Sequence, residues 1–149
     1  MKIYTSYFAN VKKLEAAGVI PISISCYPPR WFPAGYPRMK ELAPTGAMLK
    51  MTQEEYDFKF DQILDKLCPS NILEKLAGIS KQNGGADVAI LCFEKPTDFC
   101  HRHVVAKWLN QHPALSDQGS VGQIVEFGQN DTSKLKLPQN ILFANISDD

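Results

Sequence analysis

Residues 87–112, DVAILCFEKPTDFCHRHVVAKWLNQH, constrain the fold more strongly than any other part of the chain. They open with a nearly unbroken apolar run at 88–93, which is typical of a strand covered on both faces in a parallel sheet. Turn and N-cap residues follow at 96–98, and apolar side chains then recur at helical spacing over 104–109. The segment therefore predicts a central strand, a short loop and a helix.

The junction between this strand and this helix is where chemistry is expected. In open α/β sheets, ligands bind where the carboxyl ends of strands meet helix N-termini, because the first-turn N–H groups are unpaired and the helix dipole favours anions. Five side chains with catalytic or binding potential fall at this junction: Cys92, Glu94, Cys100, His101 and Arg102.

The helical spacing also predicts which way these side chains point. At about 100° per residue, His101 lies near the middle of the apolar arc and should face the end of the sheet. Cys100 and Arg102 lie on its two shoulders, whereas His103 should face solvent beside Lys107. Two interpretations of His101 stay open: a functional group, or a buried histidine whose hydrogen bonds are satisfied by a carbonyl group or by the nearby glutamate.

A thiol at a helix N-terminus, beside a cationic arginine and a histidine, is expected to have a lowered pKa. Cys100 is therefore a candidate thiolate, and the pattern favours nucleophilic or redox chemistry. The tyrosine-phosphatase signature, Cys-x5-Arg, is excluded because Asp98 stands where the arginine would follow Cys92. The residues predicted to be catalytic are Cys100, His101, Glu94 and Cys92.

Cysteine and histidine side chains are also preferred ligands of zinc, so Cys92, Cys100 and His101 with Glu94 could bind this ion. The seven residues between the two cysteines do not match a recognised zinc-finger spacing, and no metal is predicted. Glycine-rich phosphate loops of the G-x-G-x-x-G and G-K-[ST] types are absent from the sequence, so no dinucleotide or other cofactor is predicted either.

Charge and composition exclude several classes of protein. The 149 residues, 44% of them hydrophobic, predict a single α/β domain over 1–149. The 16 basic and 16 acidic residues cancel, so no global field favours nucleic acid or an anionic membrane, although a local basic patch is compatible with this balance. No run approaches the roughly 20 apolar residues of a membrane span, and the N-terminus lacks a signal-peptide pattern, so a cytoplasmic protein is expected.

The elements before the junction follow a β-α-β pattern. A strand over 1–5 opens the chain, and a helix over 11–17 follows, capped by Asn10 and ended by Gly18. The alternation at 19–26 predicts a second strand, and Pro21 near its start suggests an edge position.

Residues 27–50 are predicted to form a lid over the carboxyl edge of the sheet. The first part, YPPRWFPAGYPRMKELAP, holds five prolines and no sustained period, and a loop of this length is either functional or disordered. Its aromatic side chains argue for order. Arg30, Tyr27 and Trp31 are candidates to contact a bound ligand, since arginine suits phosphate or carboxylate, whereas Arg38 is expected to be a solvated loop charge.

The remaining elements are more conventional. A T-x-x-E capping box at 52–55 opens a helix, and Ser70 is predicted to cap a second helix before the central strand. Residues 123–127 are predicted to form a short strand. In the C-terminal segment 129–149, residues 141–146 either pack as a last extended element or hang loose.

Together these elements predict a three-layer α/β sandwich with a mostly parallel, Rossmann-like sheet of four or more strands and helices on both faces. The first strand is expected to lie between the second and the third. Cys26 would then lie about two strand spacings, roughly 10 Å, from Cys92, and the two should not be bridged. The four cysteines form no C-x-x-C pair and are expected to be free thiols in a reducing compartment.

The sequence ILCFEKPTDFCHRHVVAKWL at 90–109 resembles the hallmark of the domain-of-unknown-function family number 488, in which a strand ends in Cys-x-Glu and Cys-His-Arg opens a helix. CYPPRWF at 26–32 and IYT at 3–5 resemble the proline-rich segment and the opening strand of that family. The resemblance covers most of the chain up to Phe127. It implies characteristic positions at Cys92, Glu94, Cys100, His101, Arg102 and Arg30.

The chain also departs from the family pattern. Many relatives carry Gly-His-Ser after the first strand and Asp-Val-Arg at the end of the second, where this chain has Tyr-Phe-Ala at 7–9 and Ser-Ile-Ser at 23–25. As the family name says, its activity is not established. The resemblance therefore implies a fold and a site rather than a reaction.

Three functions stay open at this point, and whether the chain is an enzyme is not settled. The site could bind a small anion or nucleotide through Arg102, Arg30 and the helix N-terminus, with nucleic acid a further candidate that the net charge does not indicate. It could belong to a Cys/His-dependent enzyme acting on a phosphorylated or nucleotide-like substrate. Alternatively, the Cys-Glu-Cys-His-Arg cluster only stabilises the strand–helix junction of a non-catalytic structural or interaction module.

Overall fold

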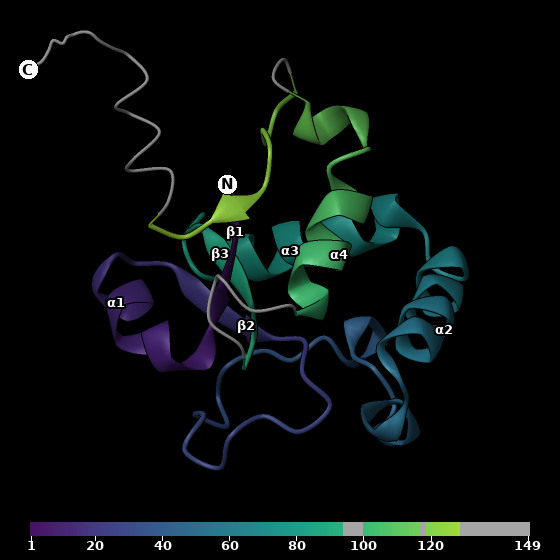
Figure 1. The fold of residues 1–149 in the computed structure, drawn as a ribbon. Helices are drawn as coiled ribbons and strands as arrows, with labels where there is room; N and C mark the ends of the chain where they lie inside the picture. Colours follow the sequence, from purple (N-terminus) through teal and green to yellow (C-terminus); the bar gives the residue numbers. More distant parts are fainter. Residues whose placement is uncertain (94–99, 117–118, 129–149) are drawn as a thin grey trace, which may run out of the picture.

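Parallel strands form the centre of the fold (Figure 1). The computed structural model describes residues 1–93, 100–116 and 119–128. Neighbouring strands in this part of the chain are parallel, which confirms the predicted α/β class with a mostly parallel sheet. The strands form one sheet in the order β2-β3-β1-β4, and their bounds are β1 Ile3–Tyr7, β2 Ile20–Ser23, β3 Val88–Cys92 and β4 Val125–Glu126.

The predicted central strand does lie inside the sheet. All five residues of β3 are buried, and Ile90 is aligned with Thr5 of β1 on one side and with Ile22 of β2 on the other. The nearly continuous apolar sequence of β3 suits this position, because elements of the fold cover both of its faces.

The predicted strand order is wrong in one respect, since β3 rather than β1 lies next to β2. Both orders leave β2 at the edge, where Pro21 is tolerated as predicted, and both give β1 and β3 a neighbour on each side. The hydrophobic pattern therefore cannot distinguish them. As a consequence, Cys26, which follows β2, and Cys92, which ends β3, belong to neighbouring strands and not to strands two spacings apart.

Helices cover both faces of the sheet, which gives the predicted three-layer sandwich (Figure 1). One face is covered by α1 (Val11–Ala16). Three further helices cover the other face: α2 (Gln53–Asp65), α3 (Pro69–Gln82) and α4 (His101–Leu109). Short 3-10 helices occur between these elements at Phe8–Asn10, Lys40–Leu42, Gly46–Lys50 and Pro113–Leu115.

Two buried apolar clusters reflect the two faces. Alternate residues of β3 point to opposite sides, so Ile90 belongs to the cluster under α2, α3 and α4, whereas Leu91 belongs to the cluster under α1. Leu76 of α3 and Leu14 of α1 are fully buried members of the two clusters. The sheet is thus held by apolar packing on both sides, and the site lies at its end.

Two predicted boundary signals are confirmed. Thr52 accepts a hydrogen bond from the backbone N–H of Glu55, whose carboxylate accepts one from the backbone N–H of Thr52, so the capping box opens α2. Gly18 follows α1 with φ of 74°, the left-handed conformation that ends many helices.

Of two other predicted caps, one is wrong and one is confirmed in position only. The N-cap of α3 is Cys68 and not Ser70, because a proline takes the first helical position, where its missing N–H costs nothing. Asn10 is the N-cap residue of α1 as predicted, but its side chain makes no capping hydrogen bond, and its amide donates to the hydroxyl of Ser6 at 3.1 Å.

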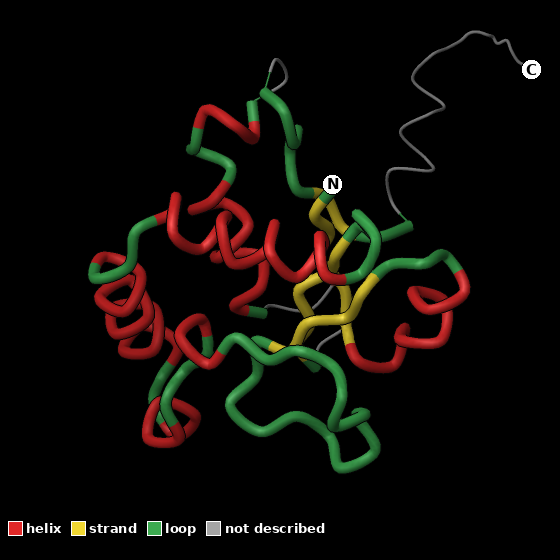
Figure 2. The backbone as a smooth tube through the Cα atoms, turned by 180° about the vertical axis from the view of Figure 1, so that it is seen from behind, coloured by secondary structure: helices red, strands yellow, loops and turns green. Residues whose placement is uncertain are grey.

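The proline-rich lid segment is packed against the end of the sheet and forms the long loop below the strands in Figure 2. Phe32 is buried and meets Phe8 edge-on, with ring centroids 5.2 Å apart. The segment then returns to β2, where Ser23 donates its N–H to the carbonyl of Pro37 at 3.1 Å and accepts the N–H of Met39 at 2.9 Å. The aromatic content of the lid therefore predicted order correctly for these residues.

Within the described residues, no helix combines the length and the apolar character needed to cross a membrane. The C-terminal segment 129–149, with its predicted extended element, lies outside the described residues. Residues 96–98 also lie outside them, and their prediction as the N-cap of the following helix is wrong, because the N-cap of α4 is Cys100.

Candidate functional site

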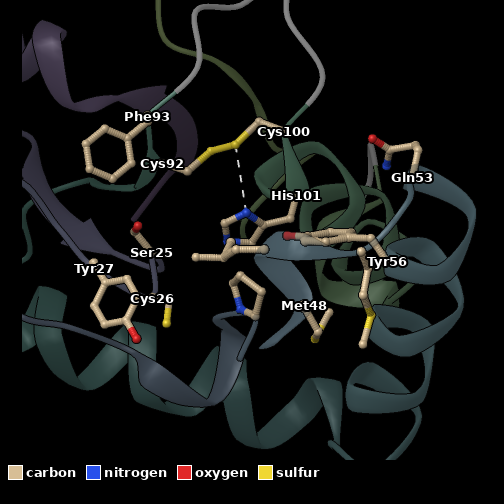
Figure 3. Close-up of a pocket in the computed structure, with 13 residues that line it drawn as sticks. Ser25, Cys26, Tyr27, Met48, Gln53, Tyr56, Cys92, Phe93, Cys100 and His101 are labelled. Carbon is tan, nitrogen blue, oxygen red and sulfur yellow. Dashed lines mark hydrogen bonds between the residues drawn. A yellow bond between two sulfur atoms is a disulfide. The ribbon is translucent and has the colours of Figure 1, made fainter. Parts of the chain in front are cut away.

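A pocket of about 480 Å³ opens at the carboxyl edge of the sheet, where β2 and β3 end and α4 begins (Figure 3). One wall follows β2 and contains Ser25 and Cys26, and the opposite side contains Tyr56 of α2. The end of β3 and the first turn of α4 contribute Cys92, Cys100 and His101. Three of the five side chains singled out at the strand–helix junction therefore face one cavity.

Cys92 and Cys100 meet at this pocket, and their sulfur atoms are joined in a disulfide (Figure 3). Their Cα atoms are 7.0 Å apart, and both side chains are buried. The prediction of four free thiols is therefore wrong for this pair, whereas Cys26 and Cys68 are free, and the expected absence of a bridge between Cys26 and Cys92 is confirmed. The spacing carries no signal of the pairing, because sequence separation alone does not fix the distance across a loop.

His101 is 6% exposed and points to the end of the sheet, as predicted. Its Nε2 lies 2.7 Å from the carbonyl oxygen of Ile24. A carbonyl oxygen can only accept a hydrogen bond, so Nε2 carries the proton and Nδ1 of the neutral ring keeps its lone pair. Nδ1 lies 3.9 Å from Sγ of Cys100, along the dashed line in Figure 3. The imidazole thus presents an accepting nitrogen to the sulfur.

The electrostatic surroundings keep the His101 ring neutral. Burial lowers the pKa of His101 below its ordinary 6.5; the hydrogen bond to Ile24 opposes this shift, and the positive charge of Arg102 adds to it. A neutral imidazole at neutral pH can act as a base or as a metal ligand.

Arg102 is fully buried and does not line the pocket. Its Nη1 donates to Sγ of Cys92 at 3.1 Å, and its Nε and Nη2 donate to the two carboxylate oxygens of Glu126 at 3.2 Å each. The ring of Tyr7 lies 6.0 Å from the guanidinium carbon. Arg102 was predicted to contact a ligand, but in the structure its charge is paired inside the protein rather than presented to the cavity.

Glu126 completes this network from β4, and the sequence pattern did not single it out. It is buried, and besides the pair with Arg102 it accepts a hydrogen bond from the hydroxyl of Thr5 at 2.5 Å. One signal could have identified it: Glu126 is the single charged residue of the predicted strand at 123–127, and a charge in an apolar strand requires a buried partner.

The family of the chain is decided by its match over residues 8–113 to the model DUF488-N3a, which is described as the active DUF488-N3 subclade. The chain belongs to this family. The match spans more than half of the sequence and includes Cys92, Cys100, His101 and Arg102, but it ends before Glu126. No curated protein and no solved structure matches the chain.

In this DUF488-N3 protein, the described members of the predicted ligand-contact set are separated. Tyr27 lines the pocket, whereas Arg30 is exposed on the lid outside it. Trp31 is exposed and borders a separate hollow beside α1. Glu94, which was predicted to be catalytic, lies outside the described residues.

Several pocket residues of the DUF488-N3 protein carry no sequence signal. Gln53 and Tyr56 of α2 and Met48 of a 3-10 helix line the cavity. The sequence around them predicts only a helix. They reach the site because α2 packs beside the end of the sheet. Only the folded chain could place them there.

His103 of the DUF488-N3 protein is half-buried, so the prediction that it faces solvent is wrong. Its Nε2 is buried and has no hydrogen-bond partner among the described residues. Burial lowers the pKa of His103, and Arg102 adds to the shift while Glu126 opposes it. The helical spacing gave the direction of this side chain correctly relative to α4, but β4 lies beside that face.

Proposed function

We propose that this DUF488-N3 protein is a Cys/His-dependent enzyme that acts on a phosphorylated or nucleotide-like substrate bound in the pocket at the carboxyl edge of the sheet. The observation that carries the proposal is the position of Nδ1 of His101, 3.9 Å from Sγ of Cys100 at the pocket wall. Because Ile24 holds the Nε2–H group, Nδ1 is the nitrogen that can take the thiol proton.

Two features favour the thiolate form once the disulfide has been reduced. Cys100 is the N-cap residue of α4, at the positive end of the helix dipole. Arg102 donates a hydrogen bond to the sulfur of Cys92 and so stabilises negative charge there. Cys100 is accordingly the nucleophile in this proposal. Cys92 is the second thiol, which closes the disulfide with it under oxidising conditions.

The pocket lining supports a nucleotide-like substrate. Tyr27, Tyr56 and Phe93 contribute aromatic rings, on which a nucleobase can stack. No acidic side chain occurs among the described lining residues, so nothing there repels a phosphate near the first turn of α4. The description of the matching subclade as active is consistent with catalysis.

One observation favours the alternative of a non-catalytic module. Arg102 has no exposed surface and joins Cys92 on β3 to Glu126 on β4, while the disulfide joins β3 to α4. These contacts are what a purely structural junction would need. The alternative predicts unreactive thiols and no response to ligands.

Cysteine alkylation separates the two possibilities. After reduction with a phosphine, the protein is treated with iodoacetamide at about pH 6, where an ordinary thiol with a pKa near 8.5 is almost fully protonated. Mass spectrometry then follows each cysteine. Cys68 is exposed and free, and it provides the matched control within the same chain. We expect Cys100 to react faster than Cys68 in spite of its burial, and His101→Gln to abolish this difference.

The substrate class is tested by thermal unfolding of the reduced protein with inorganic phosphate, nucleosides, nucleoside monophosphates and short oligonucleotides. A ligand that binds only the folded state raises the melting temperature with its concentration. We expect monophosphates to raise it more than phosphate or nucleoside alone. Slow labelling of Cys100 together with no ligand response would replace this proposal with the structural alternative.

A further inference from the structure

Three metal-ligating atoms converge at the pocket: Sγ of Cys92, Sγ of Cys100 and a ring nitrogen of His101 all lie within 4.8 Å of one another. All three side chains are buried, with exposed fractions of 1%, 2% and 6%. Thiolate and imidazole are the ligands that zinc and related soft ions prefer, and three protein ligands with one open position are typical of catalytic zinc sites.

The surroundings of these atoms also match those of a metal site. A histidine that binds a metal through one nitrogen usually donates the other N–H to a carbonyl or carboxylate, as His101 does to Ile24. This leaves Nδ1 directed at the sulfur of Cys100. Arg102 donates to Cys92, which is the kind of hydrogen bond that stabilises a coordinating thiolate.

We propose that, in the reduced protein, Cys92, Cys100 and Nδ1 of His101 form a three-ligand site for a thiophilic divalent ion of the zinc class, with the fourth coordination position open to the pocket. The sequence predicts no metal, because the spacing between the cysteines matches no zinc finger. That spacing rule applies to ligands within one short loop, whereas these ligands come from the end of a strand and the start of a helix.

The metal-bound form and the disulfide form exclude each other. A cellular dithiol converts the disulfide into two thiols by supplying two electrons and two protons, and is itself oxidised to a disulfide. When the ion binds, both thiol protons are released to solvent and each sulfur bonds to the metal. The site therefore exists only in the reduced protein, and this inference does not depend on the identity of the substrate.

Cobalt(II) is the probe for this site, because its absorption reports its ligands. The full chain is reduced with a phosphine, which water converts to the phosphine oxide, and the reductant is removed. We expect stoichiometric Co²⁺ to give a sulfur-to-cobalt charge-transfer band and the visible bands of a four-coordinate ion, and Zn²⁺ to displace it. The oxidised protein should give neither band, which provides a control that needs no variant.

Variants then assign the ligands. Cys100→Ser should reduce the charge-transfer band, and His101→Gln should weaken Co²⁺ affinity by roughly 10- to 100-fold or more, since loss of even an outer-shell partner costs that much. Cys26→Ser is the matched control, because Cys26 lines the same pocket as a free thiol outside the cluster. Circular dichroism of each variant verifies folding.

The outcomes distinguish this inference from the proposed function. If reduced wild-type protein binds no Co²⁺, binds it without a charge-transfer band, or binds it equally well after Cys100→Ser, the metal site is overturned. Fast alkylation of Cys100 without Co²⁺ uptake would overturn the metal site and leave the thiol-enzyme proposal intact. Sulfur-ligated Co²⁺ with slow alkylation of the metal-free thiols would support the metal site and contradict that proposal.

Discussion

His101 and Arg102 are consecutive, both buried and both polar, yet they lie in opposite surroundings. We call the cluster of Thr5, Arg102 and Glu126 the sealed side of α4, because the donors and acceptors of these side chains bond to one another within the protein. His101 faces the open side, where Ile24 engages one ring nitrogen and the other is directed toward a sulfur at the pocket. Burial by itself therefore does not identify a functional group. The two side chains differ in whether other groups of the protein already occupy their hydrogen-bonding atoms.

The largest expected effect is on the sealed side. Arg102→Ala should lower the free energy of unfolding by about 3–5 kcal/mol, because it leaves the carboxylate of Glu126 buried without its partner. Urea unfolding at neutral pH measures the loss. Arg30→Ala is the matched control, since Arg30 is exposed and its removal should cost no more than about 0.5 kcal/mol.

A double variant sharpens this test. The double variant Arg102→Met, Glu126→Gln removes both charges together. It should recover part of the stability that Arg102→Ala loses, because that loss comes from the unpaired charge of Glu126 and not only from the missing attraction between the two side chains. If Arg102→Ala lowers the free energy of unfolding by less than about 1 kcal/mol, as expected for an arginine that faces solvent, the result contradicts a buried ion pair on the sealed side.

An intermediate effect is expected from the pH dependence of stability. Burial lowers the pKa of His101 in the folded state, so as the pH falls through about 6.5 the unfolded chain takes up a proton that the folded chain does not. The free energy of unfolding should therefore decrease, by up to about 1.4 kcal/mol per pH unit for each such histidine, until the pH is below the folded-state pKa.

The pKa of His103 is lowered in the same direction, so the two histidines must be separated by variants. Denaturant unfolding between neutral and mildly acidic pH should show a shallower slope for His101→Gln and the shallowest slope for the variant that also carries His103→Gln. A His101→Gln protein with the wild-type slope would show that the ring is not held neutral on the open side.

The smallest effect on stability is expected at the mouth of the pocket. Tyr27 is 66% exposed, so Tyr27→Ala should change the free energy of unfolding by no more than about 0.5 kcal/mol. The same variant should lose much of the nucleotide-dependent rise in melting temperature, because Tyr27 lines the cavity. A large loss of stability with unchanged ligand response would reverse the assigned roles of the two regions.

The sequence predicted those parts of the fold that depend on local physics. The apolar run of β3 identified a strand covered on both faces, the capping box identified the start of α2, and the left-handed glycine after α1 identified its end. Strand order did not follow, because exchanging β1 and β3 leaves every strand with the same degree of burial.

The candidate site was likewise predicted only where the local sequence determines it. Cys92, Cys100 and His101 were found from sequence because they flank one strand–helix junction, and helical spacing oriented His101 correctly. The spacing could not show what lies opposite each face of α4. Arg102 met Glu126 from a strand more than twenty residues later, and Tyr56 reached the pocket from α2, which lies earlier in the chain than α3 and β3.

The return of the lid to Ser23 has a consequence for how such a protein can diversify. Because Ser23 bonds to both Pro37 and Met39, the loop over 24–36 closes on a single residue of β2, and its ends are fixed independently of its middle. Lengthening a loop whose ends are fixed adds little to the free energy of closing it, about 0.6 kcal/mol for each doubling of its length. Insertions and exchanges at the exposed positions between these anchors can therefore change which molecules enter the pocket, while the buried residues Ile24 and Phe32 keep the segment packed against the fold.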